Sequence, residues 1–348
     1  MPEFRAPKSA RNPPLPVSAL VADVAGSPAA AQHYAIALAD WIDLSGAINP
    51  HPYPVPPIDS ACWNELPEDD DGLAAAAAKF YGNDRLLVVA GAQAAIRALP
   101  ALFRPAVVAC LTPIADAQTA PWVRAGHQLR RLPTIERVLA AATPNVLLAN
   151  RNPLTGALVP RATLLDAAAR LERRGGWLIV DESLADADRE NCIAALAGSG
   201  LAPNLLVIRS LVPFFGLAGA RVGFVFGAGE KLDGLREMLG PWPVTKPSRV
   251  VARHALTDGS WQAKTRAALA INAQRLADLL APLGTTQAGT LFCSVQSCAA
   301  DALFEHFAAR AILTRRFSEN GLLRFALPGR EAGWQRLTAA VLQWKPPV

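Results

Sequence analysis

Two glycine-containing turns could bind a phosphate group. Gly91 separates an apolar run at 86–90 from a helix-like stretch at 92–102. Free backbone N–H groups and the positive end of the helix dipole would make that turn a site for an anion. Ser210 and Arg221 flank a second glycine-rich turn, where they could add a hydroxyl and a planar guanidinium to the same phosphate. A tight turn, a helix cap and an ion pair are the simpler explanations of these three residues.

A carboxylate and an arginine lie in equally informative positions. Asp181 directly follows the apolar run at 177–180. There it could pair with a protonated ring nitrogen or a metal ion, or it could cap the next helix. Arg324 lies inside the apolar run at 322–327, where an unpaired guanidinium would be costly to bury. It could hold a substrate carboxylate, or it could face solvent by alternation along the strand.

Alternating strand-like and helix-like segments would position these residues. Short apolar runs occur at 86–90, 107–111, 146–149, 177–180 and 205–208. Helix-like stretches lie between them at 92–102, 115–125, 161–173 and 191–196. Wholly apolar strands separated by helices predict a largely parallel sheet that is covered on both faces. Ligands of such sheets bind at the carboxyl ends of the strands, where the candidate residues lie.

Proline-rich segments divide the chain. The loop NPHPYPVPP at 49–57 follows a helix-like stretch at 29–41. More prolines follow Gly240 and lead into one long helical stretch at 247–283. Strand-like runs at 291–296 and 322–327, with a helix between them, complete an α+β pattern. We therefore predict an N-terminal arm and helix at 1–45, a large domain at 46–240 and a small domain at 241–348.

Composition excludes several classes of protein. Of 348 residues, 51% are hydrophobic and 18% are charged, which predicts a large buried core. The net charge of +5 is scattered without a basic, aromatic stripe, so we expect no nucleic-acid partner. No apolar stretch approaches the ~18 residues that span a membrane, and we expect a cytoplasmic protein. The five cysteines lack zinc-ligand spacing, so we expect free thiols and no metal site.

Four segments resemble motifs of one enzyme family. They are LSGAINP at 44–50, LPEDDDGL at 66–73, FFGLAGARVGF at 214–224 and LRFALPG at 323–329. Together they resemble the fold-type I pyridoxal-phosphate enzymes, and most closely the threonine-phosphate decarboxylases of cobalamin biosynthesis, relatives of histidinol-phosphate aminotransferases. The resemblance covers roughly residues 41–345.

The resemblance implies an aspartate-aminotransferase-like fold, with a mostly parallel seven-stranded sheet in the large domain and a smaller α+β domain. It implies pyridoxal 5'-phosphate as cofactor, an amino-acid phosphate as substrate and a homodimer. Asp181 would hold the pyridine nitrogen protonated, so that the ring can accept electrons. Ser210, Arg221 and the turn of Gly91, Ala92 and Gln93 would bind the cofactor phosphate.

The substrate residues also follow from the resemblance. Asn49 lies in the segment that matches the substrate loop of the family. Arg324 would bind the substrate carboxylate, and Arg315 or Arg316 would face a substrate phosphate.

Several cofactor positions depart from the family pattern. Pro213 stands where the lysine that forms the Schiff base is expected, and proline has no amine. Ala92 removes a phosphate-binding hydroxyl, and Ala115 replaces the tyrosine that stacks on the ring. Pro153 replaces an asparagine that contacts the cofactor, unless Asn152 takes that role through a shift of one residue.

These departures leave two functions open. The chain could be a pyridoxal-phosphate decarboxylase or aminotransferase that uses another lysine, for which Lys246 is the best candidate. It could instead be a degenerate homologue that binds a phosphorylated ligand, or pyridoxal phosphate without a covalent link, as a regulatory subunit or as the partner of an intact paralogue. We do not expect a DNA-binding repressor, because about forty residues before the matching region are too few for a winged helix.

Overall fold

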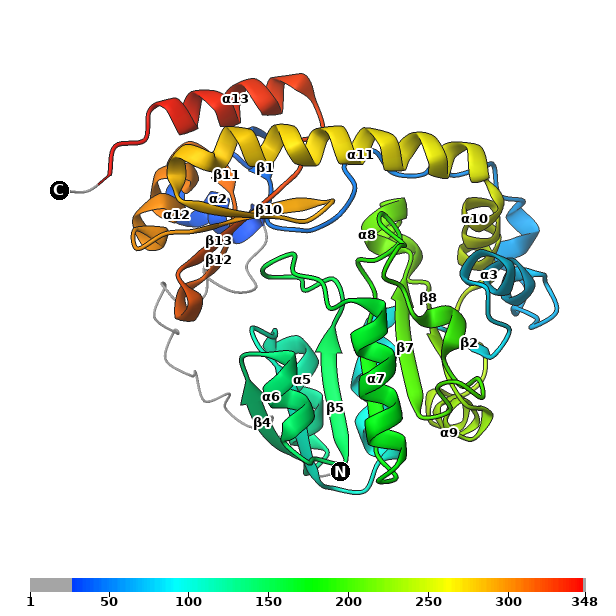
Figure 1. Cartoon of the computed structure of the whole chain (residues 1–348). Helices are drawn as coiled ribbons and strands as arrows, with labels where there is room; N and C mark the ends of the chain where they lie inside the picture. The colour runs from blue at the N-terminus through cyan, green and yellow to red at the C-terminus, as the bar shows by residue number, and fades with distance from the viewer. Residues whose placement is uncertain (1–26, 347–348) are drawn as a thin grey trace, which may run out of the picture.

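A seven-stranded sheet forms the large domain of the computed structural model, which describes residues 27–346 (Figure 1). The strands lie in the order β2-β8-β7-β6-β5-β3-β4. Their bounds are β2 Leu86–Val89, β3 Val107–Leu111, β4 Gln128–Leu132, β5 Asn145–Ala149, β6 Trp177–Asp181, β7 Leu205–Ser210 and β8 Gly223–Phe226. Only β8 runs antiparallel to its neighbours, β2 and β7. The predicted fold class and mostly parallel sheet are confirmed.

Helices cover both faces of this sheet. Along β6, Leu178 and Val180 enter one hydrophobic core and Ile179 enters the other, because successive side chains point to opposite faces. One face carries α4 (Ala92–Ala98), α5 (Asp116–Arg124) and α9 (Gly229–Leu239). The other carries α3 (Leu73–Tyr81), α6 (Ile135–Ala140) and α7 (Arg161–Glu172). This two-sided burial explains why the strands read as continuous apolar runs.

The C-terminal part contains an antiparallel sheet in the order β12-β13-β10-β9. Its strands are β9 Thr285–Ala288, β10 Phe292–Gln296, β12 Arg315–Phe317 and β13 Leu322–Ala326, and its helices include α12 (Ala300–Ala308) and α13 (Glu331–Leu342). The N-terminal segment joins this part of the molecule, since β1 (Ile42–Asp43) pairs in parallel with β11 (Ile312–Leu313). Helix α11 (Gly259–Leu280) packs against β9 and β10 and runs between this sheet and α13 in Figure 1.

Several helix predictions differ from the structure. The stretch at 247–283 is two long helices, α10 (Lys246–Thr257) and α11 (Gly259–Leu280), followed by a short 3-10 turn, η6 (Ala281–Leu283). Asp258 separates α10 from α11 because its side chain accepts a hydrogen bond from the Trp261 backbone and so caps α11. The stretch at 29–41 is α2 (Ser27–Tyr34) and the 3-10 turn η1 (Leu38–Asp40), with Ala35 between them at positive φ.

Five shorter elements connect these parts. They are the 3-10 turns η2 (Ser60–Trp63), η3 (Leu99–Leu102) and η4 (Ala194–Leu196), the single-turn helix α8 (Val212–Phe215) and the 3-10 turn η5 (Ala218–Ala220). The predicted helix at 191–196 is therefore only the η4 turn.

A buried ion-pair network joins the ends of β6 and β7. The Arg209 guanidinium contacts Glu182 at 2.7 Å and also Asp186, and all three side chains are almost fully buried. Tyr81 donates a hydrogen bond to Asp186 at 3.1 Å and lies under the guanidinium. The arginine therefore balances two acids that the fold has removed from water.

We expect Arg209→Ala to lower the free energy of unfolding by about 3–5 kcal/mol, because two buried acids lose their partner. Arg170→Ala is the matched control. It breaks a half-exposed Asp166 pair of 2.8 Å, which is worth about 0–1 kcal/mol. Urea unfolding followed by circular dichroism measures both, and equal losses would contradict a special contribution of the buried network.

Candidate functional site

The candidate residues gather at the carboxyl ends of the central strands. Asp181 is the last residue of β6 and Ser210 the last of β7. Gly223, the first residue of β8, lies opposite both Ser210 and Val89, so that the turn after β2 reaches the same edge. Parallel strands thus bring residues from distant parts of the sequence to one site, as the sequence predicts.

Close packing shapes the turn around Gly91. This residue has φ +78°, and a Cβ there would lie 3.3 Å from Arg221 Nη2. At Gly223 a Cβ would lie 2.7 Å from the Ala92 backbone nitrogen, closer than real Cβ atoms approach. Both positions therefore require glycine, and they bring the Arg221 guanidinium against the turn.

The charge at this turn is positive. Arg221 itself adopts φ +53° and, within residues 27–346, forms no ion pair with a carboxylate. Ser210 Oγ accepts a hydrogen bond from the Val212 backbone at 3.2 Å, which leaves its O–H free to donate. Gln93, at the start of α4, is exposed. The arrangement can bind a phosphate group by a guanidinium, a hydroxyl and backbone N–H groups.

The Asp181 carboxylate is held by donors on both oxygens. Its side chain is 8% exposed. Oδ1 accepts hydrogen bonds from the backbone and the hydroxyl of Ser183. Oδ2 accepts one from Gln118 Nε2 at 2.6 Å. Gln118 was not predicted from the sequence, because a glutamine on a helix carries no signal of the strand end that it will face.

Two arginines of the small domain form an uncompensated pair. Arg324 on β13 lies opposite Arg315 on β12. Arg324 donates to the backbone oxygens of Pro153 at 2.7 Å and Ser45 at 2.6 Å, while the Nε atoms of both arginines are buried without a partner. Burial, with the nearby Arg315 charge, lowers the pKa of Arg324 to about 10. An anion at this pair would supply the missing charge.

The structure separates Arg315 from its neighbour. Arg316 contacts Asp301 at 3.0 Å and so has a carboxylate partner. Arg315 has none among the residues that the structure describes. Of the two arginines proposed from the sequence, Arg315 is the better candidate for an anion ligand.

Two predicted ligand residues have local contacts. Asn49 is 3% exposed and donates its amide to the Phe214 oxygen at 2.9 Å. Asn152 donates to the Pro113 oxygen at 2.7 Å and accepts from the backbone nitrogens of Leu154 and Thr155. Both side chains therefore hold loops beside the site, and their roles toward a ligand stay predictions.

Position 213 lies in α8. Pro213 is buried in the first turn of this helix, where a backbone N–H would have no partner within the helix. Its carbonyl accepts a hydrogen bond from the Asn49 backbone at 2.8 Å, and Tyr53 binds the Phe215 carbonyl in the same way. The proline-rich loop thus fixes the backbone of α8, a helix that contains no lysine side chain.

Lys246 is engaged elsewhere. It begins α10 and forms an ion pair with Glu65. The hydrogen bond to that carboxylate raises the pKa of Lys246, which favours the protonated amine. A nucleophilic lysine needs the opposite shift. Ala115 precedes α5 as its N-cap and offers only a methyl group at the predicted ring-stacking position.

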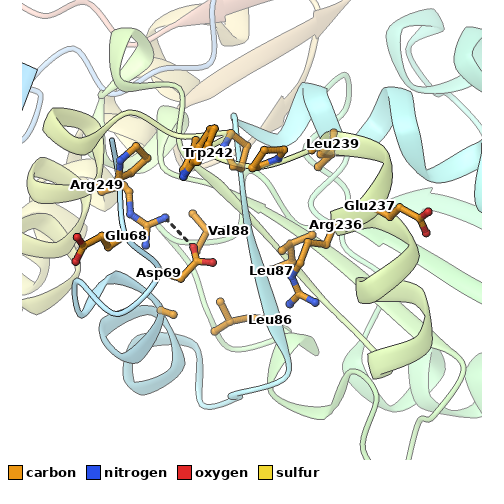
Figure 2. Close-up of a pocket in the computed structure, with 15 residues that line it drawn as sticks. Glu68, Asp69, Leu86, Leu87, Val88, Arg236, Glu237, Leu239, Trp242 and Arg249 are labelled. Carbon is orange, nitrogen blue, oxygen red and sulfur yellow. Dashed lines mark ion pairs between the residues drawn. The ribbon is translucent and has the colours of Figure 1, made fainter. Parts of the chain in front are cut away.

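A large cavity is separate from these residues. Its volume is about 710 Å³, and it lies between the free edge of β2 and the segment after α9 (Figure 2). Leu86, Leu87 and Val88 form one wall, and Leu239 and Trp242 form another. Arg249 lies 3.8 Å from Asp69 at its side. The lining includes none of the residues predicted for the cofactor or substrate.

Two further properties concern the described part of the chain. Between residues 27 and 346, no helix is both long and apolar enough to cross a membrane. The same residues contain no group of three or more His, Cys, Asp or Glu side chains that could hold a metal ion.

Sequence comparison reveals extensive similarity. The family described as aminotransferase class I and II matches residues 66–343. Threonine-phosphate decarboxylase of Pseudomonas aeruginosa is 44% identical over 322 residues, which cover 92% of this chain and 96% of the relative. A threonine-phosphate decarboxylase of Sinorhizobium is 36% identical over 338 residues, covering 93% of this chain and 98% of the relative.

Solved structures share the fold. The histidinol-phosphate aminotransferase of Sinorhizobium meliloti, in complex with pyridoxal-5'-phosphate, matches with a TM-score of 0.77 and 18% identity over 96% of this chain and 97% of that one. The L-threonine-O-3-phosphate decarboxylase of Porphyromonas gingivalis matches with a TM-score of 0.71 and 19% identity over 86% of this chain and 98% of that one.

The Gly91 turn predicts a measurable anion affinity. Arg221→Met should weaken binding of inorganic phosphate about tenfold or more, because hydrogen bonds to charged groups contribute about 1.5–3 kcal/mol. Isothermal titration calorimetry measures this change. Arg236→Met, which removes a surface partner of Asp233, is the control and should leave phosphate binding unchanged. Equal affinities of the Arg221 variant and the original protein would contradict the assignment.

Proposed function

Because the chain belongs to the aminotransferase class I and II family, which uses pyridoxal 5'-phosphate, we propose that it is a threonine-phosphate-decarboxylase-like protein that binds this cofactor without a covalent link. Its ligands are the cofactor and an amino-acid phosphate. Its decarboxylase activity is low or absent. The observation that carries the proposal is the Arg221 guanidinium against the Gly91 turn and Asp181 at the end of β6, together with Pro213 where the lysine of the family is expected.

The residues at these strand ends and turns fit the polar ends of the cofactor. Ser210, Arg221 and the Gly91 turn would hold its phosphate, and Asp181 would face the ring nitrogen. When bound, the cofactor supplies a ring that can accept electrons from the substrate. A covalent link to the cofactor has no suitable lysine, since Pro213 offers no amine and Lys246 is paired with Glu65. Weak, reversible retention of the cofactor follows.

The small-domain arginines would bind the substrate anions. Arg324 would hold a carboxylate and would orient its bond to the α-carbon. Arg315 would face the phosphate of an amino-acid phosphate. Their lack of a carboxylate partner in residues 27–346 supports this role, because two half-buried cations without acids, each with a buried and unpartnered Nε, favour an anionic ligand. In this account the protein belongs to cobalamin biosynthesis as a regulatory or partner subunit.

An active enzyme that uses Lys246 is the second candidate. The lysine lies in the segment 241–247, which matches an active-site segment of the family. Its ion pair with Glu65 weighs against this candidate, because a protonated amine cannot attack an aldehyde.

Borohydride reduction distinguishes the two candidates. With pyridoxal phosphate present, the natural chain should bind the cofactor but should give no stoichiometric label on a lysine when mapped by mass spectrometry. Pro213→Lys should become labelled at residue 213, because the first turn of α8 accepts lysine as readily as proline. Inorganic phosphate, as a competitor, should suppress site labelling but not random surface labelling. Stoichiometric labelling of Lys246, or turnover of O-phosphothreonine by the natural chain, would overturn the proposal.

The arginine pair offers a matched comparison. Arg315→Met should weaken binding of O-phosphothreonine about tenfold, since a charge-assisted bond contributes about 1.5–3 kcal/mol. Arg316→Met removes the same charge one residue away, but from a guanidinium that Asp301 already neutralises. Fluorescence or calorimetric titration should show little effect of that change. A larger loss in the Arg316 variant would refute the assignment of Arg315.

We also propose a homodimer that covers the 710 Å³ cavity. The free edge of β2 lies there, and Trp242 in the lining exposes 57% of its surface. Leu66, which directly precedes Pro67 of the lining, is 61% exposed. Exposed apolar side chains around a groove are typical of protein interfaces. A charged residue in place of Trp242 would be costly to bury.

Trp242→Glu should therefore convert a dimer to a monomer in sedimentation velocity. Ile271→Glu on α11, at a residue that is 71% exposed, is the control and should remain dimeric. A natural chain that sediments as a monomer would exclude the dimer. If the chain associates with an intact paralogue but not with itself, the assembly is a heterodimer and the homodimer proposal is wrong.

A further inference from the structure

Gln118 contacts the one acidic residue expected to face the cofactor ring. It lies on α5, 6% exposed, and its Nε2 donates to Asp181 Oδ2 at 2.6 Å. The contact bridges the helix and the end of β6, 63 residues apart in sequence. Charge-assisted bonds of this length are among the stronger hydrogen bonds in proteins.

The hydrogen bonds of Asp181 leave room for one more donor. An ionised carboxylate offers about four lone-pair positions, two on each oxygen. Ser183 donates twice to Oδ1, and Gln118 donates once to Oδ2. The single position that remains is therefore on Oδ2, and Gln118 decides how that oxygen is directed.

Packing alone does not account for the glutamine. Its Oε1 is buried without a hydrogen-bond partner. Beside it is a cavity of about 10 Å³, lined mainly by apolar side chains such as Ile96, Trp122 and Ile208. That volume is at the lower limit for one water molecule, so a larger partner has no room. A methionine or leucine would fill the same space without an orphaned oxygen, which leaves the bond to Asp181 as the benefit of the amide.

We infer that Gln118 is a positioning residue for the ring-nitrogen subsite: it fixes the Asp181 carboxylate so that one Oδ2 lone pair accepts a ring N–H. This inference deepens the proposed function and rests on it. The ligand class is a phosphorylated pyridine that can carry a proton on its ring nitrogen. The amide is suited to the task because it donates a hydrogen bond without adding charge beside the carboxylate.

A ligand pair isolates this role. Pyridoxal phosphate and its 1-deaza analogue, in which a ring C–H replaces the nitrogen, have the same phosphate and the same shape. The natural chain should prefer pyridoxal phosphate. In Gln118→Met the preference should fall about tenfold, because the oriented contact with the ring nitrogen is lost. Arg221→Met should weaken both ligands equally, because it acts at the phosphate.

Fluorescence titration of the natural chain and of Gln118→Met, each with both ligands, gives the coupling energy between Gln118 and the ring nitrogen. Circular dichroism verifies that each variant is folded, and Gln118→Leu provides a second apolar substitution. An equal loss for both ligands in the Gln118 variants, or an unchanged preference, would overturn the inference. Binding of neither ligand by the natural chain would instead overturn the proposed function.

Discussion

The candidate site depends on how the ends of β6 and β7 are held. Arg209 forms buried ion pairs with Glu182 and Asp186 on one face of the sheet. Because side chains alternate along a strand, Asp181 and Ser210 point to the opposite face. The buried ion pairs and the ligand-binding side chains therefore lie on opposite faces of the same two strands. A disturbance of the ion pairs would reach the site through only one residue on each strand.

The candidate ligand-binding arginines share one property, which is that no carboxylate of the described residues pairs with them. Arg221 beside the Gly91 turn and the pair of Arg315 and Arg324 lack carboxylate partners within the described residues. The two groups come from different domains. A ligand set with anions at two points, such as a cofactor phosphate and an amino-acid phosphate, would complete both. The proposal of a cofactor bound without a covalent link rests on α8, which carries Pro213 in a backbone fixed by Asn49 and Tyr53.

Sequence patterns predicted the backbone of this site better than its side-chain contacts. Strand β6 and Asp181 at its end follow from an apolar run and the rule that ligands bind at strand ends. Local patterns also placed Arg324 in a strand, but its burial and its contacts with Pro153 and Ser45 depend on segments distant in sequence. For the same reason, no local pattern could predict the bond from Gln118 to Asp181.

The remaining errors have a similar origin. Sequence alone could not distinguish Arg315 from Arg316, because only the fold brings Asp301 to the latter. The division between α10 and α11 was visible in principle, since Asp258 and Gly259 form a cap signal inside the predicted helix. The amide of Asn49 binds a backbone oxygen of α8, and its expected contact with a substrate stays a prediction. Its position was predictable from the motif, but its partner was not.

A crystal structure of the natural chain grown with pyridoxal phosphate tests the central claim most directly. We expect electron density for the cofactor between Arg221 and Asp181, with a clear break between its aldehyde carbon and every side chain. Continuous density from that carbon to a lysine would contradict the account, as would an ordered cofactor bound elsewhere and none at the Gly91 turn.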